Sequence, residues 1–301
     1  MEDIVRPDHF TSEFESHDMA VKAYTADAAN DVIGDTPSAD IPYVIVNGEK
    51  RYLAAHKREN NKIYGSFPKL KPALVDPRDY KDVSLLNFIK KRYNQSSQSS
   101  CVGHGVIAGV TIAHNMTGQT PQVFSPCFTY GLVNGGRDQG ANTGAGVRST
   151  AEVGACLEAT VGPMQIWKSR FPAKAFEEAK RWRTVDTETV DTFAEVCSAI
   201  MYGRPVVFGT YIGNRFNPDD EGFVPELQGT TGGHCMCAVG LKYAKGRWWL
   251  EVLNSWGANW GVNGVCYMPI SYVEKYQDMW EGYAMRVAGI DPQDTVKPLA
   301  A

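Results

Sequence analysis

A single cysteine at the start of an apolar helical pattern constrains this chain more than any other feature. The polar stretch 95–100 leads directly to Cys101, and valines then recur every fourth residue from 102 to 110. This spacing is typical of a helix that buries one face, and the serines before the cysteine favour a helix start there. The positive end of a helix dipole favours a thiolate over a thiol. We therefore predict a central helix over about 100–116 with Cys101 in its first turn, as a candidate nucleophile. The alternative is a structural cysteine at the edge of a core helix.

Two short motifs far downstream supply the partners that such a nucleophile needs. His234 opens an apolar run 133 residues after Cys101, and Asn254 begins an Asn-Ser-Trp-Gly sequence 153 residues after it. This order and spacing are typical of a cysteine nucleophile, a histidine base and an asparagine that orients the histidine. The three motifs together favour a catalytic interpretation of Cys101 over the structural one.

These motifs resemble those of the papain-like (C1) cysteine peptidases, in particular their bacterial and viral branch. The resemblance covers about residues 67–287. It implies the following roles: Cys101 as nucleophile, His234 as base, Asn254 as orienting residue, Gln95 as oxyanion-hole donor, Trp256 as cover over the His–Asn bond, and Gly144 as part of the cleft wall.

The resemblance also implies an α+β fold of two lobes with a cleft between them. We expect a mainly helical lobe over 67–185, a mainly β lobe over 186–290, and an N-terminal extension over 1–66. Two positions depart from the family pattern. Gln98 stands where the family has a disulfide cysteine, and Val102 stands where it has a tryptophan.

Local patterns predict several further elements. Residues 190–201 have the apolar spacing of an amphipathic helix, and the charged residues 173–182 suit another helix. Apolar runs predict strands over 204–209, 235–241, 247–254 and 265–269. A glycine-rich stretch over 134–148 lacks a phosphate-binding motif, and we expect its backbone to line the cleft unless it is a surface loop.

The N-terminal extension carries opposite charges in its two halves. Residues 1–40 have ten acidic and two basic side chains, whereas residues 41–92 have five acidic and twelve basic. Apolar runs on both sides of Asn47-Gly48 predict a β-hairpin over 41–54 with a type I′ turn. Since a long helical inhibitory segment is not visible, we predict that residues 1–40 dock on a protein partner rather than inhibit; the alternative is solvated charge.

Composition narrows the functional classes. The net charge of −4 gives no reason to expect nucleic acid as a partner, and we expect no membrane span because the sequence has no apolar run of about 20 residues. Seven cysteines without a signal-peptide pattern suit a reducing cytoplasm or a virus particle. Cys235 and Cys237 would share one face of a strand with His234 on the other, so we expect no metal and no cofactor.

The most specific prediction is a peptidase that cleaves peptide bonds through an acyl-thioester on Cys101, with a peptide or protein as substrate. Two alternatives stay open at this stage. The chain could be a structural or interaction component, such as a phage or virus particle protein, that retains the fold with or without activity. It could also carry out another amide chemistry on the same fold, such as peptidoglycan hydrolysis.

Overall fold

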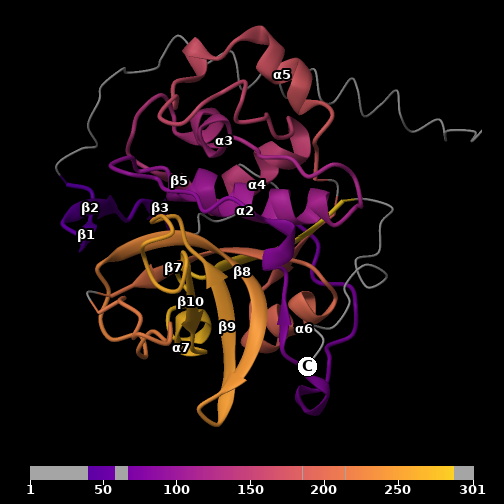
Figure 1. Cartoon of the computed structure of the whole chain (residues 1–301), viewed down its shortest axis with the longest axis vertical. Helices are drawn as coiled ribbons and strands as arrows, with labels where there is room; N and C mark the ends of the chain where they lie inside the picture. The colour runs from indigo at the N-terminus through magenta and orange to yellow at the C-terminus, as the bar shows by residue number, and fades with distance from the viewer. Residues whose placement is uncertain (1–39, 58–66, 185, 214, 288–301) are drawn as a thin grey trace, which may run out of the picture.

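The computed structural model describes residues 40–57, 67–184, 186–213 and 215–287. The docking prediction for residues 1–40 falls almost wholly on residues 1–39, which lie outside the described residues. Figure 1 shows α2 to α5 gathered in one lobe and most strands in the other, with the N-terminal hairpin beside their junction. The two-lobe α+β arrangement predicted from the sequence is confirmed.

The helical lobe is built around the predicted central helix. Its helices are α2 (Cys101–Asn115), α3 (Pro126–Val133), α4 (Thr143–Glu152) and α5 (Ala173–Ala179), with a short 3-10 turn at Lys168–Arg170. Every residue of α2 from its start to His114 is buried. The helix can pack this closely because a Cβ on Gly105 would lie only 2.7 Å from the sulfur of Cys235. Helix α2 therefore lies directly on the β lobe.

The β lobe holds a mainly antiparallel sheet in the order β10-β9-β8-β7-β11-β6, with β4 paired to β8. Its strands are β4 (Val83–Ser84), β6 (Asp186–Val190), β7 (Val206–Ile212), β8 (Gly232–Ala244), β9 (Arg247–Leu253), β10 (Val265–Met268) and β11 (Glu281–Arg286). The lobe also contains helices α6 (Phe193–Met201) and α7 (Ser271–Glu274). Sequence patterns located β7 to β10, whereas β4, β6 and β11 were not predicted.

The amphipathic helix predicted from 190 begins later in the structure. Val190 is the last residue of β6, and α6 starts after Thr192. Thr192 accepts a hydrogen bond from the backbone of Glu195, whose side chain accepts bonds from the backbone at Asp191 and Thr192. This capping box fixes the helix start, and the early boundary in the prediction was wrong for that reason.

Strand β8 separates two cores. Cys235 and Cys237 pack with α2 in one apolar cluster, while Met236 and Ala238 pack in the other, on the far side of the sheet. Side chains thus alternate between the two faces as expected of a strand. Among the described residues, no helix is both long enough and apolar enough to cross a membrane.

The N-terminal hairpin forms as predicted. Strands β1 (Tyr43–Val46) and β2 (Glu49–Tyr52) are antiparallel, and Asn47 and Gly48 both have positive φ, 52° and 79°. Two positive φ values at the centre of a two-residue turn are the mark of type I′. The chain continues into β3 (Ala55–His56), which pairs in parallel with β5 (Ala141–Asn142). This pairing brings the extension between the lobes.

The segment after the extension covers the β lobe rather than joining the helices. Short 3-10 turns form at Pro77–Asp79 and Leu86–Phe88. The backbone N–H of Leu70 donates to the carbonyl of Thr189 at 3.2 Å, and that of Val75 donates to Ser198 Oγ at 2.9 Å. Residues 67–85, which we assigned to the helical lobe, thus lie against the sheet and α6.

Candidate active site

A buried carboxylate holds the loop that delivers Cys101 to the start of α2. The N-cap residue, Ser100, makes no side-chain capping bond. Instead, the backbone N–H of Ser99 and the hydroxyl of Tyr130 both donate to Oδ1 of Asp138, at 2.9 and 2.8 Å. The hydroxyl of Tyr130 also accepts from the N–H of Gly140 at 3.0 Å. The glycine-rich stretch and the nucleophile loop are therefore bound to each other.

His234 and Asn254 are in direct contact, from β8 and from the end of β9. Nε2 of His234 lies 2.8 Å from Oδ1 of Asn254, and the same oxygen accepts the backbone N–H of Ser255 at 2.8 Å. The second bond fixes the amide so that its oxygen faces the ring, and Nε2 must then carry the proton. Nδ1 of His234 is buried and has no hydrogen-bond partner, so it is the nitrogen left to act as a base.

Trp256 covers this pair. Its ring lies 4.9 Å from that of His234, centroid to centroid, with 32° between the planes. Trp256 is itself buried and contacts Phe216 and Trp260 edge to face. The aromatic group excludes water from the His–Asn hydrogen bond, which strengthens that bond.

Gln95 is tied to the Asn-Ser-Trp-Gly motif by two hydrogen bonds of its own and by one contact of its neighbour. Its backbone N–H donates to the carbonyl of Ser255 at 2.8 Å, and its Oε1 accepts from Ser255 Oγ at 2.7 Å. The neighbouring Asn94 forms an antiparallel bridge with Trp256. These bonds turn the amide nitrogen of Gln95 inward, where it donates to the carbonyls of Tyr52 and Gln98 at 3.1 and 3.0 Å.

Residues 52–57, here called the cleft segment, pass between the lobes over this site. The carbonyl of Ala54 accepts from the N–H of Ala141 at 3.1 Å, and Ala54 forms a parallel bridge with Gly233, the residue before His234. A Cβ on Gly233 would lie 2.1 Å from the carbonyl oxygen of Ala55, and one on Gly140 would lie 2.0 Å from that of Ala54. Only glycine permits such close backbone contact on both walls.

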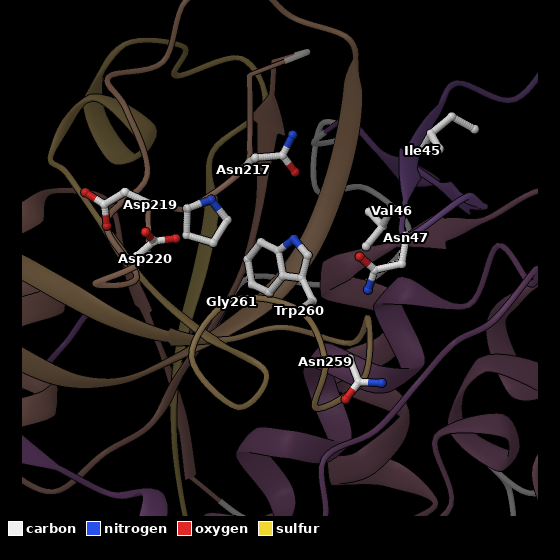
Figure 2. Close-up of a pocket in the computed structure, with 10 residues that line it drawn as sticks. Ile45, Val46, Asn47, Asn217, Asp219, Asp220, Asn259, Trp260 and Gly261 are labelled. Carbon is white, nitrogen blue, oxygen red and sulfur yellow. The ribbon is translucent and has the colours of Figure 1, made fainter.

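The cleft segment is a part of the extension for which we predicted no contact with the site. It contacts Gln95, Gly233 and Ala141, whereas the docking prediction concerns residues 1–40 and stays a prediction. The hairpin that precedes it rests beside a hollow of about 470 Å³ lined by Asn47, Asp220 and Trp260, among others. In Figure 2 the hairpin residues lie on one side of Trp260 and the loop residues Asp219 and Asp220 on the other.

Burial shifts the pKa values of Cys101 and His234 against the charged forms. Cys101 and His234 are both 0% exposed. Burial raises the pKa of the Cys101 thiol to about 11, against a smaller lowering from the backbone of Cys235 and Ala54. Burial lowers the pKa of His234 to about 4, against the hydrogen bond to Asn254. In this closed conformation burial therefore opposes the thiolate that the helix dipole favours, and it favours the neutral form of both groups.

Comparisons with known proteins agree with this geometry. Residues 140–279 match the model of the papain family cysteine protease. An uncharacterized peptidase C1-like protein of Acanthamoeba polyphaga mimivirus is 26% identical over 263 residues, which cover 79% of this chain and 84% of that protein. The chain is papain-like, in sequence and in fold.

Solved structures support the same conclusion for the fold. Xylellain, a cysteine protease from Xylella fastidiosa, superposes with a TM-score of 0.60 at 19% identity, over 74% of this chain and 96% of that one. Procathepsin L 3 of Tenebrio molitor larval midgut superposes with a TM-score of 0.62 at 12% identity, over 95% of both chains. Procathepsin B S9 from Trypanosoma congolense gives 0.62 at 14%, over 78% and 86%.

In this papain-like frame, the family match includes His234 and Asn254 but begins after Cys101 and Gln95. The assignment of Cys101 and Gln95 therefore rests on their motif and on their position. Gly144, which we expected in the cleft wall, lies in the first turn of α4, where a Cβ would meet Tyr283 and Glu281. The backbone that pairs with the cleft segment belongs to Ala141 and Asn142.

Sequence reasoning missed two parts of the papain-like site. Asp138 is a buried carboxylate in a stretch that we described by its glycines alone, and a lone acidic residue there was the available signal. The cleft segment offered no signal of this kind, because Ala54 and Ala55 carry no functional side chain. Within the described ranges, no group of histidine, cysteine or acidic side chains is arranged to hold a metal ion.

Proposed function

We propose that this chain is a cysteine peptidase that cleaves peptide bonds through an acyl-thioester on Cys101. One observation carries the proposal: His234 is held by Asn254 through Nε2 while its Nδ1 has no partner. The next residue along β8, Cys235, has its backbone beside the Cys101 thiol. An oriented histidine, one residue before a backbone group that lies at a thiol on a helix start, suits nucleophilic catalysis.

The chemistry follows from these positions. Nδ1 of His234 takes the thiol proton, and the sulfur of Cys101 attacks the carbonyl carbon of the substrate. Gln95 Nε2 and the backbone N–H of Cys101 donate to the oxygen that becomes negative. His234 then returns its proton to the leaving amine as the C–N bond breaks. A water molecule hydrolyses the thioester, which releases the acid and restores the thiol.

The described conformation supports a latent form of such an enzyme. The side-chain N–H of Gln95 is bound to the carbonyl of Tyr52. Cys101 and His234 have no exposed surface, and the backbone of Ala54 lies at the Cys101 thiol. A substrate can reach the sulfur only after residues 52–57 leave the cleft. We propose that the cleft segment is inhibitory in this state; the docking role expected of residues 1–40 stays a separate prediction.

A peptide-cleavage assay on the full chain tests the proposal. We expect the unmodified protein to cleave a peptide mixture slowly, and Ala54→Arg, which cannot keep the cleft segment in place, to cleave it faster. Cys101→Ser and His234→Ala in the Ala54→Arg chain should abolish cleavage. A thiol-directed epoxide should modify Cys101 in the Ala54→Arg chain.

Two results would favour a different function. A folded Ala54→Arg protein that neither cleaves any peptide nor reacts with the epoxide at Cys101 would favour a non-catalytic structural component. Cleavage of peptidoglycan fragments in preference to peptides would favour the other amide chemistry.

A further inference from the structure

A small internal cavity lies beside Asn254, between helix α2 and the end of β9. Its volume is about 10 Å³, and its polar lining comes from His104, Asn254 and Ser255. Each of these three residues is at most 5% exposed. A cavity of about this size holds a single water molecule when polar groups line it.

One polar atom of the site needs such a partner. The oxygen of the Asn254 side chain is bound to His234 and to the backbone of Ser255, but its amide nitrogen, Nδ2, is buried without any hydrogen-bond partner. Buried N–H groups in folded proteins are nearly always paired, with water where no protein atom is available. Nδ2 of Asn254 is therefore an unpaired donor, and Asn254 lines the cavity.

His104 presents the matching acceptor. Its Nδ1 lies 2.9 Å from the carbonyl oxygen of Ser100, and a carbonyl can only accept, so Nδ1 carries the proton. Burial keeps the ring neutral by lowering the pKa of His104 to about 4. Nε2 then has a free lone pair. His104 lies one helical turn after Cys101, so this acceptor belongs to the helix that carries the nucleophile.

We propose that one water molecule occupies this cavity, accepts a hydrogen bond from Asn254 Nδ2 and donates one to His104 Nε2. The water bridge makes His104 a positioning residue for Asn254 and, through it, for His234. The bridge also joins α2 in one lobe to the end of β9 in the other. The bridge itself follows from the geometry; its effect on turnover rests on the proposed function.

The first test needs no activity and uses the full chain in its closed form. A crystal structure at a resolution that shows ordered water should contain one water within hydrogen-bond distance of Asn254 Nδ2 and His104 Nε2. Nitrogen-15 NMR of the histidine side chains should show His104 as the neutral tautomer protonated at Nδ1. A dry cavity, or a His104 ring protonated at Nε2, overturns the proposal.

The second test separates positioning from packing. His104→Phe removes the acceptor and keeps the ring, whereas His104→Gln retains an oxygen that can accept near the position of Nε2. In the Ala54→Arg chain we expect His104→Phe to lower kcat by about five- to tenfold, the worth of one hydrogen bond, with KM changed by less than about twofold. His104→Gln should restore most of the loss and should keep the water in its crystal structure.

His114→Phe is the matched control. His114 is buried on the same helix but packs against Phe124 and Trp182, away from the cavity. It should alter stability without the loss in kcat. Equal losses in His104→Phe and His114→Phe, or no rescue by glutamine, would show that His104 only packs. If no variant cleaves peptides, the proposed function fails, and the water and tautomer measurements still decide this inference.

Discussion

The side-chain nitrogen of Gln95 donates a hydrogen bond to the carbonyl oxygen of Tyr52, at 3.1 Å. The donor that we assign to the developing oxyanion thus binds a peptide carbonyl of the same chain. The backbone of Ala54 and Ala55 also contacts both walls of the cleft. The structure therefore describes a site that is assembled and covered at the same time.

Displacing the cleft segment should activate the protein. Ala54 is 3% exposed and lies against Gly140 and Gly233, so a longer side chain there has no room. We expect Ala54→Arg to raise peptide turnover and epoxide labelling of Cys101 by at least about tenfold, which corresponds to about 1.4 kcal/mol in the opening equilibrium. Ile45→Arg, on the 55% exposed hairpin surface, is the control. Equal rates in a folded Ala54→Arg protein would contradict the latent state.

The reactivity of Cys101 should rise with pH over different ranges in the closed and open chains. Burial raises the thiol pKa to about 11, so in the unmodified chain alkylation should be slow at pH 7 and rise about tenfold per pH unit up to pH 10. In the Ala54→Arg chain, water and His234 can stabilise the thiolate, and the rate should level off below pH 8. Iodoacetamide rates, mapped by mass spectrometry, measure both profiles. A plateau near pH 7 in the unmodified chain would argue against the covered thiol.

Acid should destabilise the fold through its buried histidines. The pKa values of His104, His114 and His234 are each lowered to about 4 by burial, against about 6.5 in an unfolded chain. Between these values the unfolded chain binds more protons, so this stability is complete above pH 6.5 and is lost as pH falls toward 4. Each histidine accounts for roughly 3 kcal/mol at most. Thermal unfolding from pH 7 to 4.5 measures the slope, which His114→Phe should reduce; an unchanged slope would oppose this assignment.

Replacing Gln95 should have opposite effects in the two states. In the Ala54→Arg chain, Gln95→Ala removes an oxyanion donor, and kcat should fall by about 100-fold while KM changes little. In the otherwise unmodified chain, the same substitution removes the bond to Tyr52, and epoxide labelling of Cys101 should become a few times faster. Steady-state kinetics and labelling rates give the two values. A fall in labelling in both backgrounds would mean that Gln95 is needed only for packing.

Asp138 should be required for the start of α2. Asp138→Ala leaves the N–H of Ser99 and the hydroxyl of Tyr130 without their acceptor, which should cost roughly 3 kcal/mol of unfolding free energy. Asp138→Asn keeps an oxygen in place and should cost less. Urea unfolding measures both, with Asp76→Ala, in an exposed pair with Arg78, as the control. An Asp138→Ala protein as stable as the control would show that other contacts hold this loop.

The sequence alone determined the elements whose signals are local. The valine spacing after Cys101 placed α2 to within a residue at each end, since one helical face must be buried wherever the chain packs. The Asn47-Gly48 pair fixed the hairpin turn, because few residues adopt two successive positive φ values. The motifs at His234 and Asn254 likewise located two residues that the fold brings to 2.8 Å.

Tertiary structure alone decided what depends on contacts between distant segments. The cleft segment contacts Gly233, Ala141 and Gln95 through its backbone. Contacts made by backbone atoms cannot be predicted from the side chain of Ala54. The direction of the Cys101 pKa was decided in the same way. The helix dipole acts within one turn of the sequence, but the burial that outweighs it comes from the apolar cluster around Cys101, whose members, such as Ala54 and Cys235, lie far away in the sequence. Local periodicity can locate a nucleophile, whereas its protonation state depends on what the whole fold places over it.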